Sequence, residues 1–114
     1  LTGKDVASLP HYEKLVEAQP EIYELRLNYA QALVNTKRFE EAAAQLAKAE
    51  EIKPGQAKTL DLLSATGQAE LAAGDETGAM KRFEAVLAKN PKSGDALYGM
   101  GSAMRKAGDR AAAE

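Results

Sequence analysis

Apolar residues recur at helical spacing along the chain and stand at fixed distances before three prolines. A large apolar residue lies eight residues before each proline, with a small residue four places before it and a medium apolar residue three places after it. The large residues are Tyr12, Leu46 and Phe83, before Pro20, Pro54 and Pro91. Spacings of three and four place such residues on one face of an α-helix. The pattern predicts helices that end at the prolines, because proline lacks an amide donor and restricts the residue before it.

The same periodicity predicts helices over most of the sequence. They are expected at residues 9–19, 21–35, 38–52, 56–73, 76–89 and 94–107, with another from about residue 110. Asp75 can cap the helix expected from residue 76, and Ser93 can cap the one expected from residue 94. Gly108-Asp109 repeats the pair Gly74-Asp75, so a turn is expected there before the last helix. The predicted fold class is therefore all-α.

The prolines divide the helices into repeated pairs. They are 34 and 37 residues apart, and 34 residues is the tetratricopeptide period. The first helix of each unit has a small residue near its middle, at Ala30, Gly67 and Gly101. The chain thus resembles the tetratricopeptide repeat family, in which helix pairs stack into a right-handed α-solenoid. That family has apolar residues four places before and three places after the small one, and Arg26 and Glu70 depart from this pattern.

The resemblance divides the chain, as one domain of residues 1–114, into whole and partial repeats. The expected units are a partial repeat 1–22, a repeat 23–56, a repeat 57–93 with three extra residues, and a partial repeat 94–114. The first residue is Leu1, and neither end has the polar outer face of a capping repeat. We therefore expect a fragment of a longer array, and the alanine-rich, cysteine-free composition suggests a bacterial source.

Composition adds limits on the core and on the partners. Apolar residues make up 45% of the chain and aromatic residues only 5%, so a thin core is expected, with Phe39, Leu46 and Phe83 between neighbouring repeats. No apolar run reaches membrane-spanning length. The 15 basic and 17 acidic residues are spread along the helices, which is not the basic surface of a nucleic-acid-binding protein. A chain without cysteine has no disulfide framework and suits the bacterial cytoplasm or the periplasm.

No group of residues has the arrangement of a catalytic, cofactor or metal site. The segment 55–59 ends like a phosphate-binding loop, but Ala57 stands where that motif needs glycine and no strand precedes it. His11 is the single histidine, and there is no second histidine or cysteine to share a metal ion with it. We therefore expect no enzymatic activity, no cofactor and no metal.

The resemblance implies that the first helix of each repeat lines a concave groove for an extended peptide or a partner helix. The residues expected there are Glu24, Leu27, Asn28, Gln31, Asp61, Ser64, Ala65, Gln68, Asp95, Tyr98, Ser102 and Arg105. Their amide and hydroxyl groups can bond an extended backbone. Glu24, Asp61 and Asp95 are expected along one edge, which favours a basic partner, although acidic residues in a first turn also complement the helix dipole.

Some tetratricopeptide domains hold a C-terminal carboxylate with a clamp of lysine, asparagine and arginine. Asn28 fits that clamp, but Asp61 and Asp95 stand where basic residues would be needed and would repel a carboxylate. A clamp is not expected. Three functions stay open: a scaffold that binds a protein or peptide, which we favour; self-assembly through exposed repeat ends; and an accessory array that presents substrate to an enzyme domain. By family analogy, such arrays also serve envelope or secretion assembly.

Overall fold

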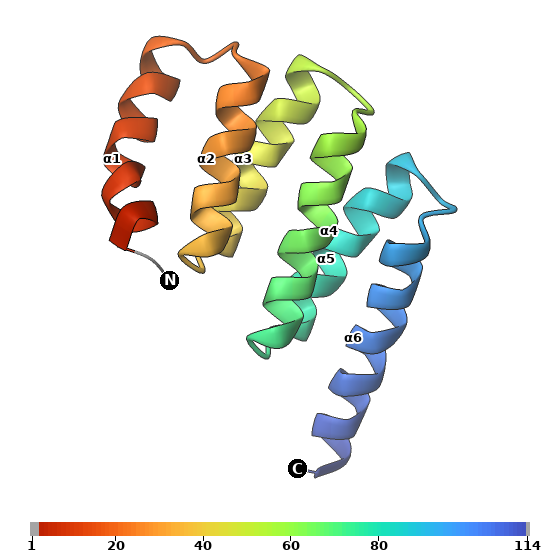
Figure 1. The fold of residues 1–114 in the computed structure, drawn as a ribbon. Coiled ribbons are helices and arrows are strands. Elements are labelled where there is room, and N and C mark those ends of the chain that lie inside the picture. Colours follow the sequence, from red (N-terminus) through yellow and green to blue (C-terminus); the bar gives the residue numbers. More distant parts are fainter. Residues whose placement is uncertain (1–2, 114) are drawn as a thin grey trace. The chain divides into compact units, whose positions relative to one another are not determined.

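The structure is a computed structural model that describes residues 3–113, with side chains from Ser8 to Ala112. Its helices are α1 (Gly3–Ala18), α2 (Tyr23–Asn35), α3 (Phe39–Ile52), α4 (Ala57–Ala72), α5 (Glu76–Lys89) and α6 (Gly94–Ala113) (Figure 1). No strand occurs within residues 3–113, so the all-α prediction is confirmed. The predicted partial repeats begin at residue 1 and end at residue 114, and both of these positions lie outside the described residues.

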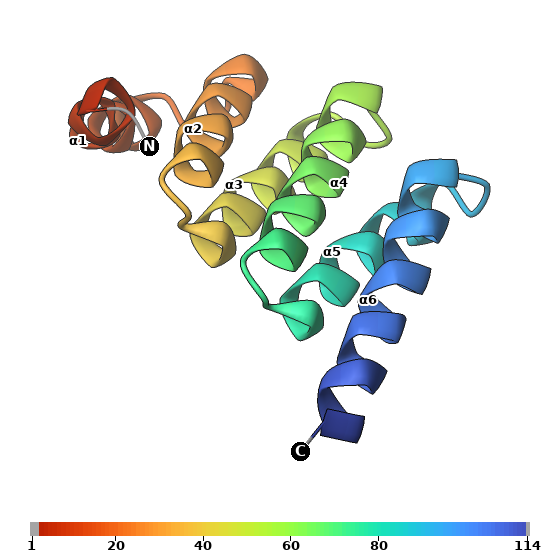
Figure 2. The ribbon, with the colours of Figure 1, turned by 60° about the horizontal axis from the view of Figure 1, so that its bottom comes forward.

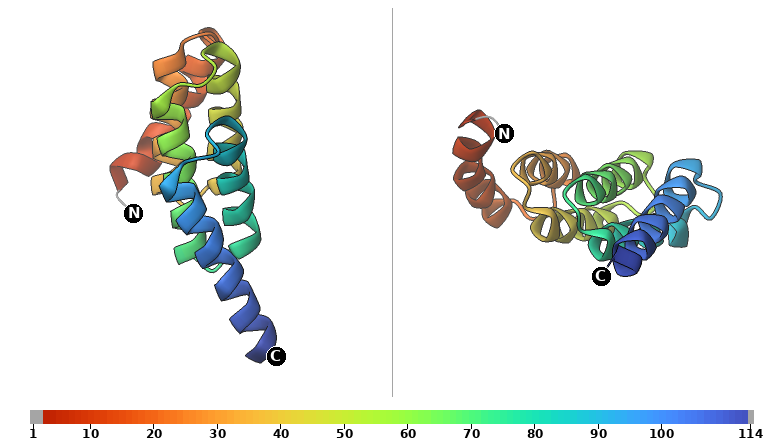
Figure 3. Two further views of the ribbon diagram at one scale, coloured as in Figure 1. Left: turned by 90° about the vertical axis from the view of Figure 1, so that its right-hand side faces the viewer. Right: turned by 90° about the horizontal axis from the view of Figure 1, so that it is seen from below.

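The chain forms two compact units, and the boundary between them in the sequence falls within α4, between Leu62 and Leu63. In the first unit α2 packs against both α1 and α3, and Figure 1 shows these three helices running in alternating directions. Figure 3, seen from below, shows them again as neighbours. In the second unit α5 packs against α6, and Figure 2 shows the two helices side by side. Each unit is therefore built from antiparallel helix neighbours joined by short turns.

The core of the first unit lies between α1, α2 and α3. Its buried cluster comprises Leu9, Val16, Tyr29, Ala32, Leu33 and Ala42. The rings of Tyr12 and Tyr29 stack on its border, with centroids 5.8 Å apart. Burying a leucine or valine side chain contributes about 1.5–3 kcal/mol, so this cluster accounts for the docking of α1 onto α2.

Helix α1 begins at Gly3, so the predicted start at residue 9 is wrong. Pro10 lies inside the helix, although a proline there removes one backbone hydrogen bond and crowds the preceding turn. Leu9 and Val16, on either side of Pro10, are both buried in the core of the first unit. This packing on both sides of the proline offsets the lost hydrogen bond.

Helices α2 to α5 begin and end within two residues of the predicted positions. Both predicted caps are present: Asp75 Oδ1 accepts a hydrogen bond from the Gly78 amide at 2.9 Å, and Ser93 Oγ accepts one from the Ala96 amide at 3.3 Å. The turn before α5 contains Gly74 at a φ of 89°, a conformation that favours glycine. The local signals of turn and cap residues were therefore sufficient to locate the starts of α5 and α6.

Helix α6 continues through Gly108 and Asp109, so the predicted turn and separate last helix are wrong. The alanines that follow Asp109 have high helix propensity and favour continuing the existing helix. Arg110 adds two contacts: its Nη1 donates to the carbonyl of Gly74 in the turn before α5 at 3.2 Å, and its Nη2 lies 2.8 Å from Oε2 of Glu76, the first residue of α5. These contacts hold the end of α6 in place.

The core of the second unit is organised around Phe83, which is fully buried. A Cβ atom placed on Gly67 of α4 would lie 2.9 Å from the Phe83 ring, and one on Gly99 of α6 would lie closer still. The ring therefore fills space that only glycine leaves open on both helices. Phe83 lies between neighbouring helices as predicted, while Phe39 is only partly buried.

A buried ion pair joins α4 to α5. Arg82 Nε lies 2.9 Å from Glu70 Oε1, and the two side chains are 8% and 0% exposed. Glu70 stands where the repeat pattern has an apolar residue. The pair explains this departure, because a buried carboxylate is tolerated when a cation and hydrogen bonds satisfy it.

Two glycines of α6 should respond in opposite directions to alanine. Gly99→Ala should lower the free energy of unfolding by about 1–3 kcal/mol, because the new methyl group overlaps the Phe83 ring in a filled core. A Cβ atom on Gly101 meets nothing within 4 Å, so Gly101→Ala should raise the free energy of unfolding by about 0.5–1 kcal/mol. Denaturant unfolding of both variants checks this packing, and equal stabilities would contradict it.

Candidate functional site

A shallow groove in the first unit lies between α2 and the first turns of α4. It has a volume of about 350 Å³ and is lined by Glu24, Leu27, Asn28, Gln31, Lys58, Asp61 and Leu62. We call this the α2–α4 groove. All of its lining residues were predicted site residues except Lys58 and Leu62.

The α2 side of the groove combines apolar and amide groups. Leu27 is 5% exposed and therefore belongs to the packed interior, whereas Asn28 and Gln31 are exposed. Gln31 Nε2 donates to Asn35 Oδ1 at 3.0 Å, one helical turn further on. This bond orients the Gln31 side chain and leaves its carbonyl oxygen and second N–H for a ligand.

The charged residues of the groove come from both helices. Lys58 Nζ of α4 lies 3.7 Å from Glu24 Oε1 of α2, and both side chains are largely exposed. Such an exposed pair contributes about 0–1 kcal/mol. Asp61 lies three residues beyond Lys58 and lines the same groove. The groove edge that was expected to be acidic therefore contains Lys58 as well as the carboxylates of Glu24 and Asp61.

The start of α4 is fixed against α2 by a buried hydrogen bond. Tyr23 Oη and Thr59 Oγ1 are 2.7 Å apart, and Thr59 is fully buried. Lys53 Nζ lies 5.2 Å from the centre of the Tyr23 ring, close enough for a cation–π interaction. Thr59 lies between Lys58 and Asp61 in sequence, so this bond sets how far the charged groups of α4 stand from α2.

The remaining predicted site residues lie on α4 and α6 in the second unit. Most are exposed: Ala65, Gln68, Asp95, Tyr98 and Arg105. Ser102 is partly buried, and Ser64 is buried with 8% of its surface exposed. Their part in a binding surface stays a prediction.

Comparison of the sequence with models of known protein families identifies the family of the chain. Two family models described as tetratricopeptide repeat match residues 7–57 and 70–114. The chain belongs to the tetratricopeptide repeat family. A comparison with curated protein sequences gave no match.

Several solved structures are similar to this tetratricopeptide repeat chain. One described as MamA MSR-1 C2 is 17% identical, with a TM-score of 0.66 over 93% of this chain; the chain spans 59% of that structure's length. The first TPR of Spaghetti (RPAP3), bound to the HSP90 peptide SRMEEVD, is 25% identical over 90% of this chain and 79% of its own, with a TM-score of 0.62. The first TPR domain of human RPAP3 is 23% identical over 98% and 86%, with a TM-score of 0.64. These likenesses show the fold class, an α-solenoid of helix pairs.

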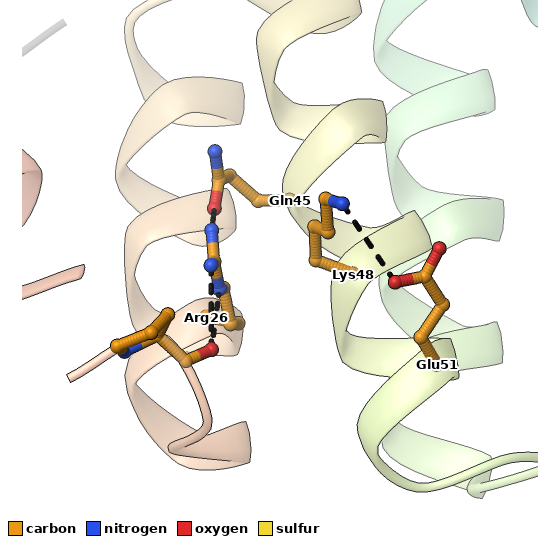
Figure 4. Close-up of polar contacts among 5 residues, drawn as sticks. Arg26, Gln45, Lys48 and Glu51 are labelled. Atoms are coloured by element: carbon orange, nitrogen blue, oxygen red, sulfur yellow. Dashed lines mark hydrogen bonds and ion pairs between the residues drawn. The ribbon is translucent and has the colours of Figure 1, made fainter. Parts of the chain in front are cut away.

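Arg26, which stands where the tetratricopeptide pattern has an apolar residue, lines a second hollow in the first unit and makes hydrogen bonds there. The hollow has a volume of about 210 Å³ and is lined by Pro20, Glu21, Arg26, Lys48, Glu51 and Ile52. Arg26 Nε and Nη2 donate to the Pro20 carbonyl, both at 3.3 Å, and Arg26 Nη1 donates to Gln45 Oε1 at 2.6 Å (Figure 4). Arg26 therefore ties the loop after α1 and helix α3 to α2, which is a structural role.

The described part of this tetratricopeptide repeat chain contains no cluster of metal-binding side chains. No group of three or more histidine, aspartate or glutamate residues there could hold a metal ion. Burial raises the pKa of Tyr29, with the negative charges of Glu13 and Glu41 adding to the effect, so the phenol stays uncharged near neutral pH. None of the described helices combines the length and the apolar character that crossing a membrane requires.

Sequence reasoning missed four residues that shape the α2–α4 groove. Lys58 lies three residues before Asp61, so extending the predicted helix face by one turn would have included it. Leu62 lies three residues before the predicted site residue Ala65 and so belongs to the same helix face. Tyr23 and Thr59 gave no comparable signal, because their bond joins residues 36 positions apart on different helices.

Proposed function

We propose that the chain is a non-catalytic scaffold that binds a peptide segment of a partner protein, extended or helical, in the α2–α4 groove. The family supports this proposal, because tetratricopeptide repeats are typically non-catalytic modules for protein interaction. A relative with 25% identity, the first TPR of Spaghetti (RPAP3), is bound to an HSP90 peptide. The main structural support is that five residues expected in a binding groove from the family resemblance line a single groove.

The groove offers three kinds of contact to such a segment. The partly exposed Leu62 can contact an apolar side chain, while the amides of Asn28 and Gln31 can bond the peptide backbone. The groove lining contains two carboxylates and one lysine, so its net charge is negative. A segment that carries lysine or arginine therefore suits the groove better than an acidic one. Exposed charges of this kind affect association rate and specificity more than affinity.

Removing both groove amides should weaken binding about tenfold, since each hydrogen bond contributes about 0.5–1.5 kcal/mol. The probe is a peptide selected from a random-peptide library on the immobilised chain, and its affinity is measured by fluorescence polarisation. The variant carries Asn28→Ala and Gln31→Ala. The loss should be similar at low and high salt, because hydrogen bonds between neutral groups are little affected by screening.

The control for this experiment is Gln19→Ala, which removes an exposed amide between α1 and α2. It should bind the selected peptide as the parent does. A library that gives no binding peptide would contradict the proposal, and so would selected peptides that bind the double variant and the parent equally well.

Self-association is the second candidate function, and exposed apolar residues on α6 favour it. Leu97 is 52% exposed, Met104 is 58% exposed and Tyr98 is 73% exposed. Exposed apolar surface of this kind is a common feature of interaction sites. Light scattering at several concentrations separates the two functions, because the mean mass rises with concentration only if the chain associates with itself.

A further inference from the structure

We propose that Lys58 determines the specificity of the α2–α4 groove by acting as an internal competitor, which an arginine side chain of the bound peptide displaces. The inference rests on the proposed function and goes beyond it by naming the side chain that the groove selects. It also assigns a role to a residue that the repeat pattern did not identify.

The contact of Lys58 in the groove is loose. Its Nζ lies 3.7 Å from Glu24 Oε1, beyond the usual 2.7–3.2 Å of a hydrogen bond. The two side chains are 71% and 61% exposed. Pairs with this exposure contribute little to stability, so the Lys58 side chain can move into solvent at small cost.

The charges of the groove lining favour replacement of Lys58 by another cation. The lining contains Glu24 and Asp61 as carboxylates and Lys58 as its one cation, which leaves one negative charge in excess. The carboxylates belong to α2 and α4, so they enter the groove from different helices. An acidic ligand side chain would add to the negative excess, whereas a basic one would neutralise it.

Arginine suits this position better than a second lysine. A guanidinium is planar and has five N–H donors, so it can bond two carboxylates at once, whereas an ammonium is a compact and strongly hydrated point charge. The neighbouring Leu62, which is partly exposed, can cover the apolar stem of the arginine. The groove should therefore select an arginine flanked by an apolar residue.

Lys58 is not needed to hold the two helices together. The start of α4 is fixed against α2 by the hydrogen bond of Tyr23 with the fully buried Thr59. Replacing Lys58 by methionine keeps the length of the side chain and removes its charge. The substitution should therefore change the ligand preference of the groove without changing the fold.

The same unit offers a matched control at Lys48. Its Nζ also lies 3.7 Å from a carboxylate, that of Glu51, and the two side chains are 58% and 70% exposed (Figure 4). Both residues lie on α3 and line the second hollow, not the α2–α4 groove. Lys48→Met therefore changes the net charge of the chain by the same amount at a similar surface pair.

The experiment compares peptide binding by the parent, Lys58→Met and Lys48→Met. Peptides selected from the random library on the parent should be enriched in arginine. Lys58→Met should bind them about two- to fivefold more tightly, which corresponds to the loss of a competing pair worth up to about 1 kcal/mol. Lys48→Met should bind them as the parent does, and the gain should disappear when the arginine of the peptide is replaced by alanine.

Other results overturn the inference in recognisable ways. Selected peptides without enriched arginine, or an affinity that Lys58→Met leaves unchanged or weakens, would refute it even if binding still depends on Asn28 and Gln31. Tighter binding of the acidic peptide SRMEEVD to the parent than to Lys58→Met would show that Lys58 attracts anions instead. Binding that is independent of Asn28 and Gln31 would refute the proposed function itself.

Discussion

Replacing Phe83 by alanine should lower the free energy of unfolding by about 3–5 kcal/mol. The ring is fully buried and occupies the space beside Gly67 of α4 and Gly99 of α6. Because neither glycine has a side chain, the cavity left by the ring would be bordered by helix backbone that cannot collapse into it. The loss should therefore fall in the upper part of the range for buried aromatic residues.

Urea unfolding of Phe83→Ala measures this loss, and Phe39→Ala is the matched control. Phe39 is the other phenylalanine of the chain and is only partly buried, so its truncation should cost clearly less. A Phe83→Ala variant with the midpoint of the parent, or no less stable than Phe39→Ala, would show that the ring does not hold α4, α5 and α6 together.

Breaking the ion pair of Glu70 and Arg82 should have an effect of similar size. Glu70→Leu leaves the guanidinium of Arg82 buried without its carboxylate, and Arg82→Met leaves the carboxylate without its cation. Removing one partner of a buried pair typically costs about 3–5 kcal/mol, because the remaining charge is poorly solvated. Each single variant should therefore be strongly destabilised.

The double variant, Glu70→Leu with Arg82→Met, should recover most of the lost stability, since apolar residues of similar volume often replace a buried pair at little cost. A double-mutant cycle by urea unfolding measures the coupling. The exposed pair of Lys48 with Glu51 should give at most about 1 kcal/mol in the same cycle. Losses that simply add in the Glu70 and Arg82 variants would contradict the coupling.

Local signals in the sequence were enough to predict most of the fold. The prolines, the apolar spacing and the cap residues Asp75 and Ser93 act within a few positions of each helix end. The start of α1 and the end of α6 were missed because tertiary contacts decide them. The buried side chains around Pro10 hold α1 together, and the contacts of Arg110 hold the last turns of α6.

The candidate site was predictable on one helix and less so between helices. The resemblance to the tetratricopeptide repeat family implied Glu24, Leu27, Asn28 and Gln31 on α2, and all four line the α2–α4 groove. The distance of Lys58 from Glu24 depends on how α4 packs on α2, through Tyr23 and Thr59. The ion-pair partner of Glu70 is Arg82, which lies on another helix. The sequence pattern alone therefore could not account for a charged residue at the position of Glu70.

The location of the bound peptide tests the proposed function most directly. An NMR titration of the chain with a library-selected peptide should shift the backbone signals of residues 24–31 and 58–62, together with the side-chain amide signals of Asn28 and Gln31. The signals of the second hollow, around Lys48 and Glu51, should stay in place. Shifts confined to that hollow or to α5, with the α2–α4 groove unchanged, would contradict binding in the groove.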